Sequence, residues 1–235
     1  MFGYYGYYGI DSYYLLLVVP AMLICLWAQI KVKSTYSRYS QVRASRGWTA
    51  DQVARMILNA NGLQDIPIER VSGNLTDHYD PRSRVIRLSA SVYGQSSVAA
   101  IGVAAHEVGH AVQHAEGYGP LTVRNLIIPV CNVGSQLAIP LILLGLLFNF
   151  EKLAALGVFL FALAVLVQLI TLPVEFNASR RALSTLKGEA ILEGSELSGA
   201  RKVLSAAALT YVASLLLAVA QLLRLVALTG RGRRD

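Results

Sequence analysis

Three of the four histidines in the chain lie within one short segment, AAHEVGHAVQHAEG, at residues 104–117. A spacing of four residues puts His106 and His110 on one face of a helix, so both imidazoles can bind the same metal ion. Glu107 lies between them and can accept a proton from a water molecule on that ion. We therefore predict that His106 and His110 bind zinc and that Glu107 is a general base. The alternative is two packed or exposed histidines without a metal.

The third histidine of the segment, His114, is not expected to bind the same ion. The residues after His110 are Ala-Val-Gln, which continue a helix. A straight helix rises about 1.5 Å per residue, so His114 lies about 12 Å beyond His106. Because a Zn–N bond is only about 2.0–2.1 Å long, we expect a supporting or surface role for His114.

A catalytic zinc site typically has three protein ligands, so a third must come from outside the helix. The candidates are His78, Glu175, Glu189, Glu193 and Glu196. Glu175 is favoured because it directly follows an apolar segment, and a membrane hairpin could return it to the metal helix. Pro173 is expected in the first turn of a new helix there. The alternative is that Glu175 only stabilises a helix N-terminus.

The composition indicates that a membrane protein positions these residues. Hydrophobic residues make up 54% of the 235 residues, charged residues make up 15%, and the mean hydropathy is +0.49. Soluble domains have about a quarter charged residues. The two cysteines lie inside apolar segments and form neither a disulfide framework nor a metal knuckle. Apolar segments long enough to span a bilayer cover residues 13–30, 126–148, 153–172 and 206–223.

Basic residues predict the orientation of the chain. Residues 31–124 contain eleven of the 21 Lys and Arg residues, and residues 173–205 contain five. One hairpin separates these two segments, so both lie on the same side, which the positive-inside rule makes cytoplasmic. The basic tail RGRRD would then lie outside, unless the last apolar segment is shallow or re-entrant. The net charge of +7 is assigned to this topology, and no nucleic-acid partner is expected.

The first polar segment is expected to contain a small sheet. An amphipathic helix is predicted at 48–63, with Thr49 as its N-cap, and the metal helix at 96–116. Alternation of apolar and polar residues predicts strands at 66–71 and 84–89. The second strand, RVIRLS, is either an edge strand that binds the substrate backbone or an ordinary strand of the sheet.

Further residues could contact a substrate or the transition state. His78 and Tyr79 lie in the turn before RVIRLS, where either could donate a hydrogen bond to the oxyanion of a cleaved carbonyl. The alternative is a turn held by the side chains of Asp77 and Asp80. Arg180 or Arg181 could pair with Glu175 or a substrate carboxylate, or both could be basic anchors at the membrane interface.

Four segments together resemble the bacterial YugP-like, or neutral zinc metallopeptidase, family. They are HEVGHAVQHAEGYGPLTVRN, LTDHYDPRSRVIRLS, LPVEFNASRRAL and AAALTYVA, and the resemblance covers nearly the whole chain. It implies a membrane-bound gluzincin in which His106, His110 and Glu175 bind zinc and Glu107 is the general base. The chain departs from the family pattern at Asn177, where an Asp that supports a metal-binding His is expected. Which residue orients each imidazole is therefore open.

We expect a mainly α integral membrane protein with about four transmembrane helices and a gluzincin-like metallopeptidase domain that contains a small β-sheet. The expected parts are a transmembrane helix at 1–30, a cytoplasmic zincin-like domain at 31–124, a transmembrane hairpin at 125–172, a cytoplasmic helical segment at 173–205, and a last transmembrane helix with a basic tail at 206–235.

The expected function is a zinc-dependent endopeptidase anchored in the plasma membrane, with its site on the cytoplasmic face. It would use one Zn²⁺ per chain and a zinc-activated water, with a polypeptide as substrate and the lipid bilayer as its surroundings. One alternative is a site-two-type intramembrane protease, but the apolar stretch before His106 is too short to span a bilayer. The other is a non-catalytic scaffold, although structural zinc sites typically have four protein ligands, often cysteines.

Overall fold

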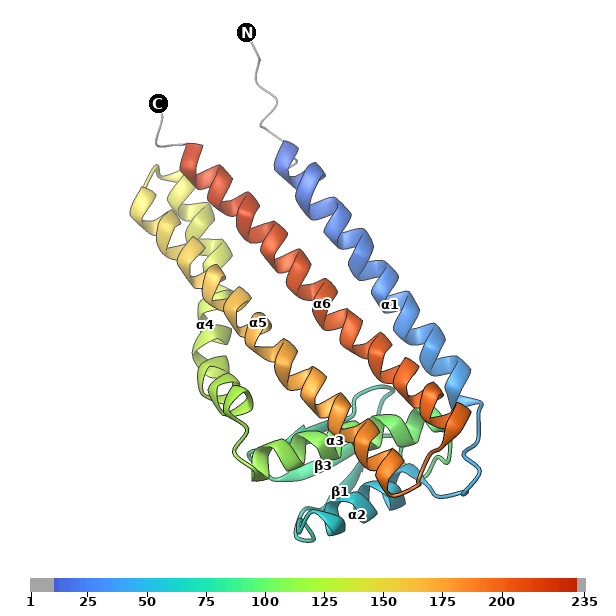
Figure 1. Ribbon diagram of the computed structural model, residues 1–235. Helices are drawn as coiled ribbons and strands as arrows, with labels where there is room; N and C mark the ends of the chain where they lie inside the picture. Colours follow the sequence, from blue (N-terminus) through green and yellow to red (C-terminus); the bar gives the residue numbers. More distant parts are fainter. Residues whose placement is uncertain (1–10, 232–235) are drawn as a thin grey trace. The chain divides into compact units, whose positions relative to one another are not determined.

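The computed structural model describes residues 11–231, so most of the tyrosine-rich N-terminal segment and the last four residues of the tail lie outside the described part. The described part is mainly helical, with one three-stranded sheet (Figure 1). In chain order, its elements are a π-helical turn (Tyr14–Val18), α1 (Val19–Ser40), α2 (Ala50–Ala60), β1 (Ile68–Val71), β2 (His78–Asp80), β3 (Val85–Ser89), α3 (Val98–Ala115), α4 (Gly119–Leu147), α5 (Glu151–Gly188) and α6 (Gly194–Arg231).

The chain divides into two compact units. The membrane unit comprises residues 1–29, 123–172 and 210–235, and the site unit comprises residues 30–122 and 173–209. Within the described residues, four helices are long and apolar enough to cross a membrane. Each of these helices continues from one unit into the other. The apolar pattern in the sequence marked only their membrane part, so α1 ends ten residues later than predicted and α6 begins twelve residues earlier.

The membrane unit exposes large apolar side chains along its helices. Leu126, Leu16 and Leu147 are 79%, 72% and 73% exposed. Apolar surfaces of this extent are uncommon on soluble monomers but are expected where helices face lipid. The exposed surface therefore agrees with the span prediction.

In the membrane unit, α4 and α5 form the predicted hairpin. The chain turns at Asn149, which has a φ of 51°. Glycines allow the two helices to approach each other closely. A Cβ atom on Gly157 would lie 2.6 Å from the carbonyl oxygen of Ala138, and one on Gly145 would meet the backbone of Ala154. Small residues at helix contacts are typical of membrane proteins, because they let the helix backbones pack directly.

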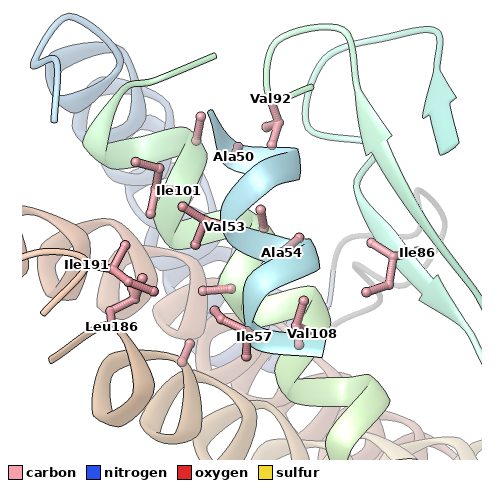
Figure 2. Close-up of a cluster of buried hydrophobic side chains, with 14 of the residues drawn as sticks. Ala50, Val53, Ala54, Ile57, Ile86, Val92, Ile101, Val108, Leu186 and Ile191 are labelled. Atoms are coloured by element: carbon pink, nitrogen blue, oxygen red, sulfur yellow. The ribbon is translucent and has the colours of Figure 1, made fainter. Parts of the chain in front are cut away.

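The core of the site unit surrounds α2 and α3. Figure 2 shows Val53 and Ile57 of α2 packed among side chains from α3, from β3 and from the end of α5. Ile101 and Val108 of α3 are 1% and 0% exposed. Thr49 is the N-cap of α2, as predicted, and its N–H donates to the side chain of Gln52. This packing fixes α3, which carries the histidines, on most of its sides.

The small sheet has the strand order β1-β3-β2, with β1 parallel and β2 antiparallel to β3. The edge-strand interpretation of RVIRLS is therefore wrong. Ile86 of β3 pairs with Ile68 on one side and with Tyr79 on the other, so β3 is the central strand. Strand β2, which was not predicted, forms an edge of the sheet.

The expected helix start at Pro173 is also wrong. Pro173 lies inside α5, which continues without a break from the membrane unit into the site unit. An internal proline removes one backbone hydrogen bond, and helices that cross membranes tolerate it because neighbouring groups satisfy the freed carbonyl. The residues after Pro173 thus extend a long helix.

Candidate metal centre

His106 and His110 from α3 converge with Glu175 from α5. Their Nε2 atoms are 3.2 Å apart, and Oε2 of Glu175 lies 3.3 Å from Nε2 of His106 and 3.6 Å from Nε2 of His110. In residues 11–231, these three form the one group of His, Cys, Asp and Glu residues whose potential ligand atoms gather in this way. His114 is not part of the group. Of the five candidates for a third ligand, Glu175 is the one that the fold brings to the histidines.

The spacing of the three atoms fits a tetrahedral zinc ion. Ligand bonds of about 2.0–2.2 Å at tetrahedral angles place neighbouring ligand atoms about 3.3–3.6 Å apart. The observed separations of 3.2, 3.3 and 3.6 Å match this range. Two imidazole nitrogens and one carboxylate oxygen are also ligands that zinc commonly takes. Glu175 is 3% exposed, so its carboxylate is largely shielded from water.

The surroundings of His110 favour positive charge. Burial alone would lower the pKa of the His110 imidazole, but the carboxylates of Glu175 and Glu107 raise its pKa above the usual value. These carboxylates would stabilise either a proton or a bound cation at Nε2 of His110. The electrostatics of the site therefore agree with its geometry.

A buried glutamine orients His110. Oε1 of Gln113 lies 3.0 Å from Nδ1 of His110, so an Nδ1–H donates to it and leaves Nε2 for a metal. The amide Nε2 of Gln113 donates to the carbonyl of Val174 and to Oδ1 of Asn177, each at 2.9 Å. Arg181 also donates to Asn177, at 2.7 Å. Asn177 thus supports His110 through Gln113, without the negative charge that an aspartate would bring.

A hydroxyl group lies against His106. Oγ of Ser179 is 3.1 Å from Nδ1 of His106 and can accept its N–H. Sequence reasoning named neither Ser179 nor Gln113 as a supporting residue. The available signal was helical spacing: Ser179 follows Glu175 by four residues and Gln113 follows His110 by three, so each shares a helix face with a ligand.

Glycine allows α3 and α5 to approach each other at the metal centre. A Cβ atom on Gly109 would lie 2.8 Å from the carbonyl oxygen of Ala178, closer than side chains normally pack. The absent side chain lets the backbone of α5 lie directly against α3. Gly109 directly precedes His110, and Ala178 lies about one turn after Glu175, so this contact sets the distance between the ligands.

Strand β2 lies beside Glu107. The Glu107 side chain is buried, and its Oε2 accepts a hydrogen bond of 3.0 Å from the backbone N–H of Tyr79. The Tyr79 hydroxyl lies 2.8 Å from Nδ1 of His114. Burial raises the pKa of Tyr79, so its hydroxyl stays protonated at neutral pH. Tyr79 therefore connects the proposed general base to the third histidine of the motif.

Aspartate side chains hold β2 in place, as the alternative interpretation of this turn expected. The Asp77 carboxylate accepts hydrogen bonds from the backbone N–H and the hydroxyl of Ser89, at 2.7 and 3.0 Å. Asp80 accepts a hydrogen bond of 2.6 Å from Ser83, which is the main cause of its lowered pKa. Both aspartates therefore hold the segment that contains Tyr79 in position beside Glu107.

Two other predicted contact residues are not brought to the metal ligands. His78 is exposed, and its Nδ1 lies 2.8 Å from the carbonyl oxygen of Thr76. Arg180 is exposed on α5, whereas the next residue, Arg181, forms an ion pair of 2.7 Å with Glu116. A role of His78 or Arg180 in substrate binding stays a prediction.

Comparison with known proteins agrees with a zinc site in a membrane protein. A family model described as "Putative neutral zinc metallopeptidase" matches residues 14–230. The chain is similar to the "Putative membrane protease YugP" of Bacillus subtilis (strain 168), with 51% identity over 222 residues, which is 94% of this chain and 99% of the relative. No solved structure matches. Both similarities extend over the membrane helices as well as the metal centre.

Proposed function

The chain belongs to the family of neutral zinc metallopeptidases, and from this premise we propose that it is a membrane-anchored endopeptidase with Glu107 as its general base. The observation that carries the proposal is the convergence of two imidazoles and one carboxylate next to a buried glutamate. His106, His110 and Glu175 would hold one zinc ion per chain, in a gluzincin-like arrangement.

The protein's own residues would move the protons of the reaction. Bound zinc would supply Lewis-acid chemistry, because it polarises a scissile carbonyl and lowers the pKa of water. The backbone N–H of Tyr79 holds Oε2 of Glu107, so Oε1 would accept the proton from the attacking water. Glu107 would then pass this proton to the leaving amine nitrogen.

An extended substrate would bind along β2. This strand is an edge of the sheet, and the backbone N–H of Tyr79 points to Glu107 rather than to β3. A peptide that adds to this edge would have its backbone next to the general base, and strand addition is a common mode of peptide recognition. The Tyr79 hydroxyl could donate a hydrogen bond to an oxyanion formed there.

We place the metal centre on the cytoplasmic face of the plasma membrane. The polar segments that form the site unit carry most of the Lys and Arg residues of the chain, which favours the cytoplasmic side.

Two other functions have less support. For an intramembrane protease, the motif helix should lie in the bilayer, yet α3 is not among the candidate membrane spans of residues 11–231. For a scaffold with structural zinc, a buried glutamate beside an open three-ligand site would have no use.

The test is the Glu107→Gln variant of the full-length protein, purified in detergent and assayed with a fluorescently labelled unstructured polypeptide. Loss of a general base should lower the cleavage rate by about 10²–10⁴-fold, while the zinc content stays that of the wild type. Glu189→Gln is a matched control, because Glu189 is exposed near the end of α5. Full cleavage activity in Glu107→Gln would contradict the role of Glu107 as general base, and no cleavage by the wild type would favour the scaffold.

A further inference from the structure

A basic groove lies between α1 and α6 within the site unit, away from the metal ligands. It has a volume of about 570 Å³. Its polar lining includes Lys31, Ser34 and Arg38 from α1 and Arg201, Lys202 and Ser205 from α6. The helices that form the groove are labelled in Figure 1. Four positive charges thus converge on one hollow.

The two helices that form the groove are in direct contact. The ring of Tyr39 packs against Gly199, where a Cβ atom would lie 2.7 Å from the ring carbons. This contact allows α1 and α6 to approach each other. The Arg38 guanidinium lies 5.8 Å from the centre of the same ring. The two walls are therefore held together by side-chain packing, and the groove is part of the folded site unit.

The charges of the groove are available to a ligand. In the part of the chain that the structure describes, no ion pair joins Lys31, Arg38, Arg201 or Lys202 to an aspartate or glutamate. All four side chains are exposed. Four cations in one hollow repel each other, so an anion bound among them would relieve this repulsion.

The position of the groove along both helices matches the surface of a bilayer. Lys31 is the first charged residue after the apolar segment of α1, and Lys202 is the last charged residue before the apolar segment of α6. Leu209 lines the same groove on the apolar side. Lipid phosphates lie at this level, and basic pockets between membrane helices on the cytoplasmic side bind anionic headgroups.

We propose that this groove binds the phosphate headgroup of an anionic phospholipid. The phosphate lies among the four basic side chains, with a hydrogen bond from Ser205, and the acyl chains follow Leu209 toward the hydrocarbon. This lipid site is independent of the peptidase function and of the metal ligands.

The test uses native mass spectrometry of the full-length protein in detergent, titrated with phosphatidylglycerol or phosphatidylcholine. The wild type should retain phosphatidylglycerol selectively. The double variant Arg201→Gln/Lys202→Gln should bind it about ten- to thirtyfold more weakly, because each basic residue near the surface contributes to lipid attraction. The control is Lys33→Gln/Lys187→Gln, which removes the same charge from exposed residues outside the groove and should bind like the wild type.

Two results would overturn the proposal. Equal weakening in both double variants would mean general attraction between a basic surface and anionic lipid. Displacement of phosphatidylglycerol by millimolar inorganic phosphate would mean a site for free phosphate. Unchanged zinc content and melting temperature in both variants serve as the check that each one is folded.

Discussion

Helix α3 has polar side chains on two sides, and the surroundings of these two sides differ. Toward α5, His106 and His110 are held by side chains from long, packed helices, and Gln113 is fully buried. Toward β2, Glu107 and His114 contact a strand of three residues at the edge of the sheet. The first side has the rigidity that metal ligands require, and the second lies at a strand edge that a polypeptide substrate could use. Substitutions on the two sides should therefore affect different properties.

The largest effect on zinc binding is expected from Gly109→Ala. The added methyl group would meet the backbone of α5 and push Glu175 away from the histidines. We expect about 1–3 kcal/mol of destabilisation from overpacking, together with loss of zinc. Thermal unfolding and zinc content measure both effects.

Gly102→Ala is the matched control on the same helix. Its Cβ atom would lie 3.4 Å from that of Ala200, an ordinary contact, so zinc binding should persist. Normal zinc content in both variants would show that close approach at Gly109 does not position the ligands.

The next effect is expected from Gln113→Met, which keeps the side-chain volume but removes three polar contacts. Because His110 would lose the group that orients it, zinc affinity should fall by about 10–100-fold. Competition with a chelator of known affinity measures this change. Wild-type affinity in a folded variant would mean that Gln113 serves packing alone.

Ser179→Ala should have a smaller effect on the same property. Its hydroxyl makes one contact with His106, and the site is open enough there for water to replace it. A lost hydrogen bond of this kind corresponds to about a two- to tenfold decrease in zinc affinity. A larger loss than in Gln113→Met would reverse the expected order of support for the two histidines.

The smallest effect on zinc is expected on the other side of α3. Tyr79→Phe removes the hydroxyl near His114 but keeps the backbone N–H that contacts Glu107. Zinc content should not change, whereas kcat/KM for a polypeptide should fall about fivefold through the lost hydrogen bond. Zinc loss in Tyr79→Phe would abolish the distinction between the two sides.

Local patterns predicted much of the fold, because they act within a few residues. The spacing of His106, Glu107 and His110 and the four apolar segments each follow from helical geometry, and α3 and the membrane spans lie where the sequence placed them. Strand β2 was missed because a strand of three residues, next to one aspartate and ending in another, is too short to show a period. Its conformation depends on pairing with β3 and on the side chains of Asp77 and Asp80.

The long-range part of the site could be predicted only partly. Glu175 was favoured among five candidates by its position after an apolar segment, and the resemblance to a known family strengthened this preference before the structure brought it to the histidines. The link from Asn177 through Gln113 to His110 joins residues more than 60 positions apart, and no pattern in the sequence encodes it.

The most direct measurement is the zinc content of the full-length protein, purified in detergent without chelators, for the wild type, Glu175→Ala and His114→Ala. The two-histidine, one-glutamate site predicts one zinc per chain in the wild type and in His114→Ala, and almost none in Glu175→Ala. Zinc that is retained without Glu175 and lost without His114, or a wild type that never contains zinc, would contradict the proposed metal centre.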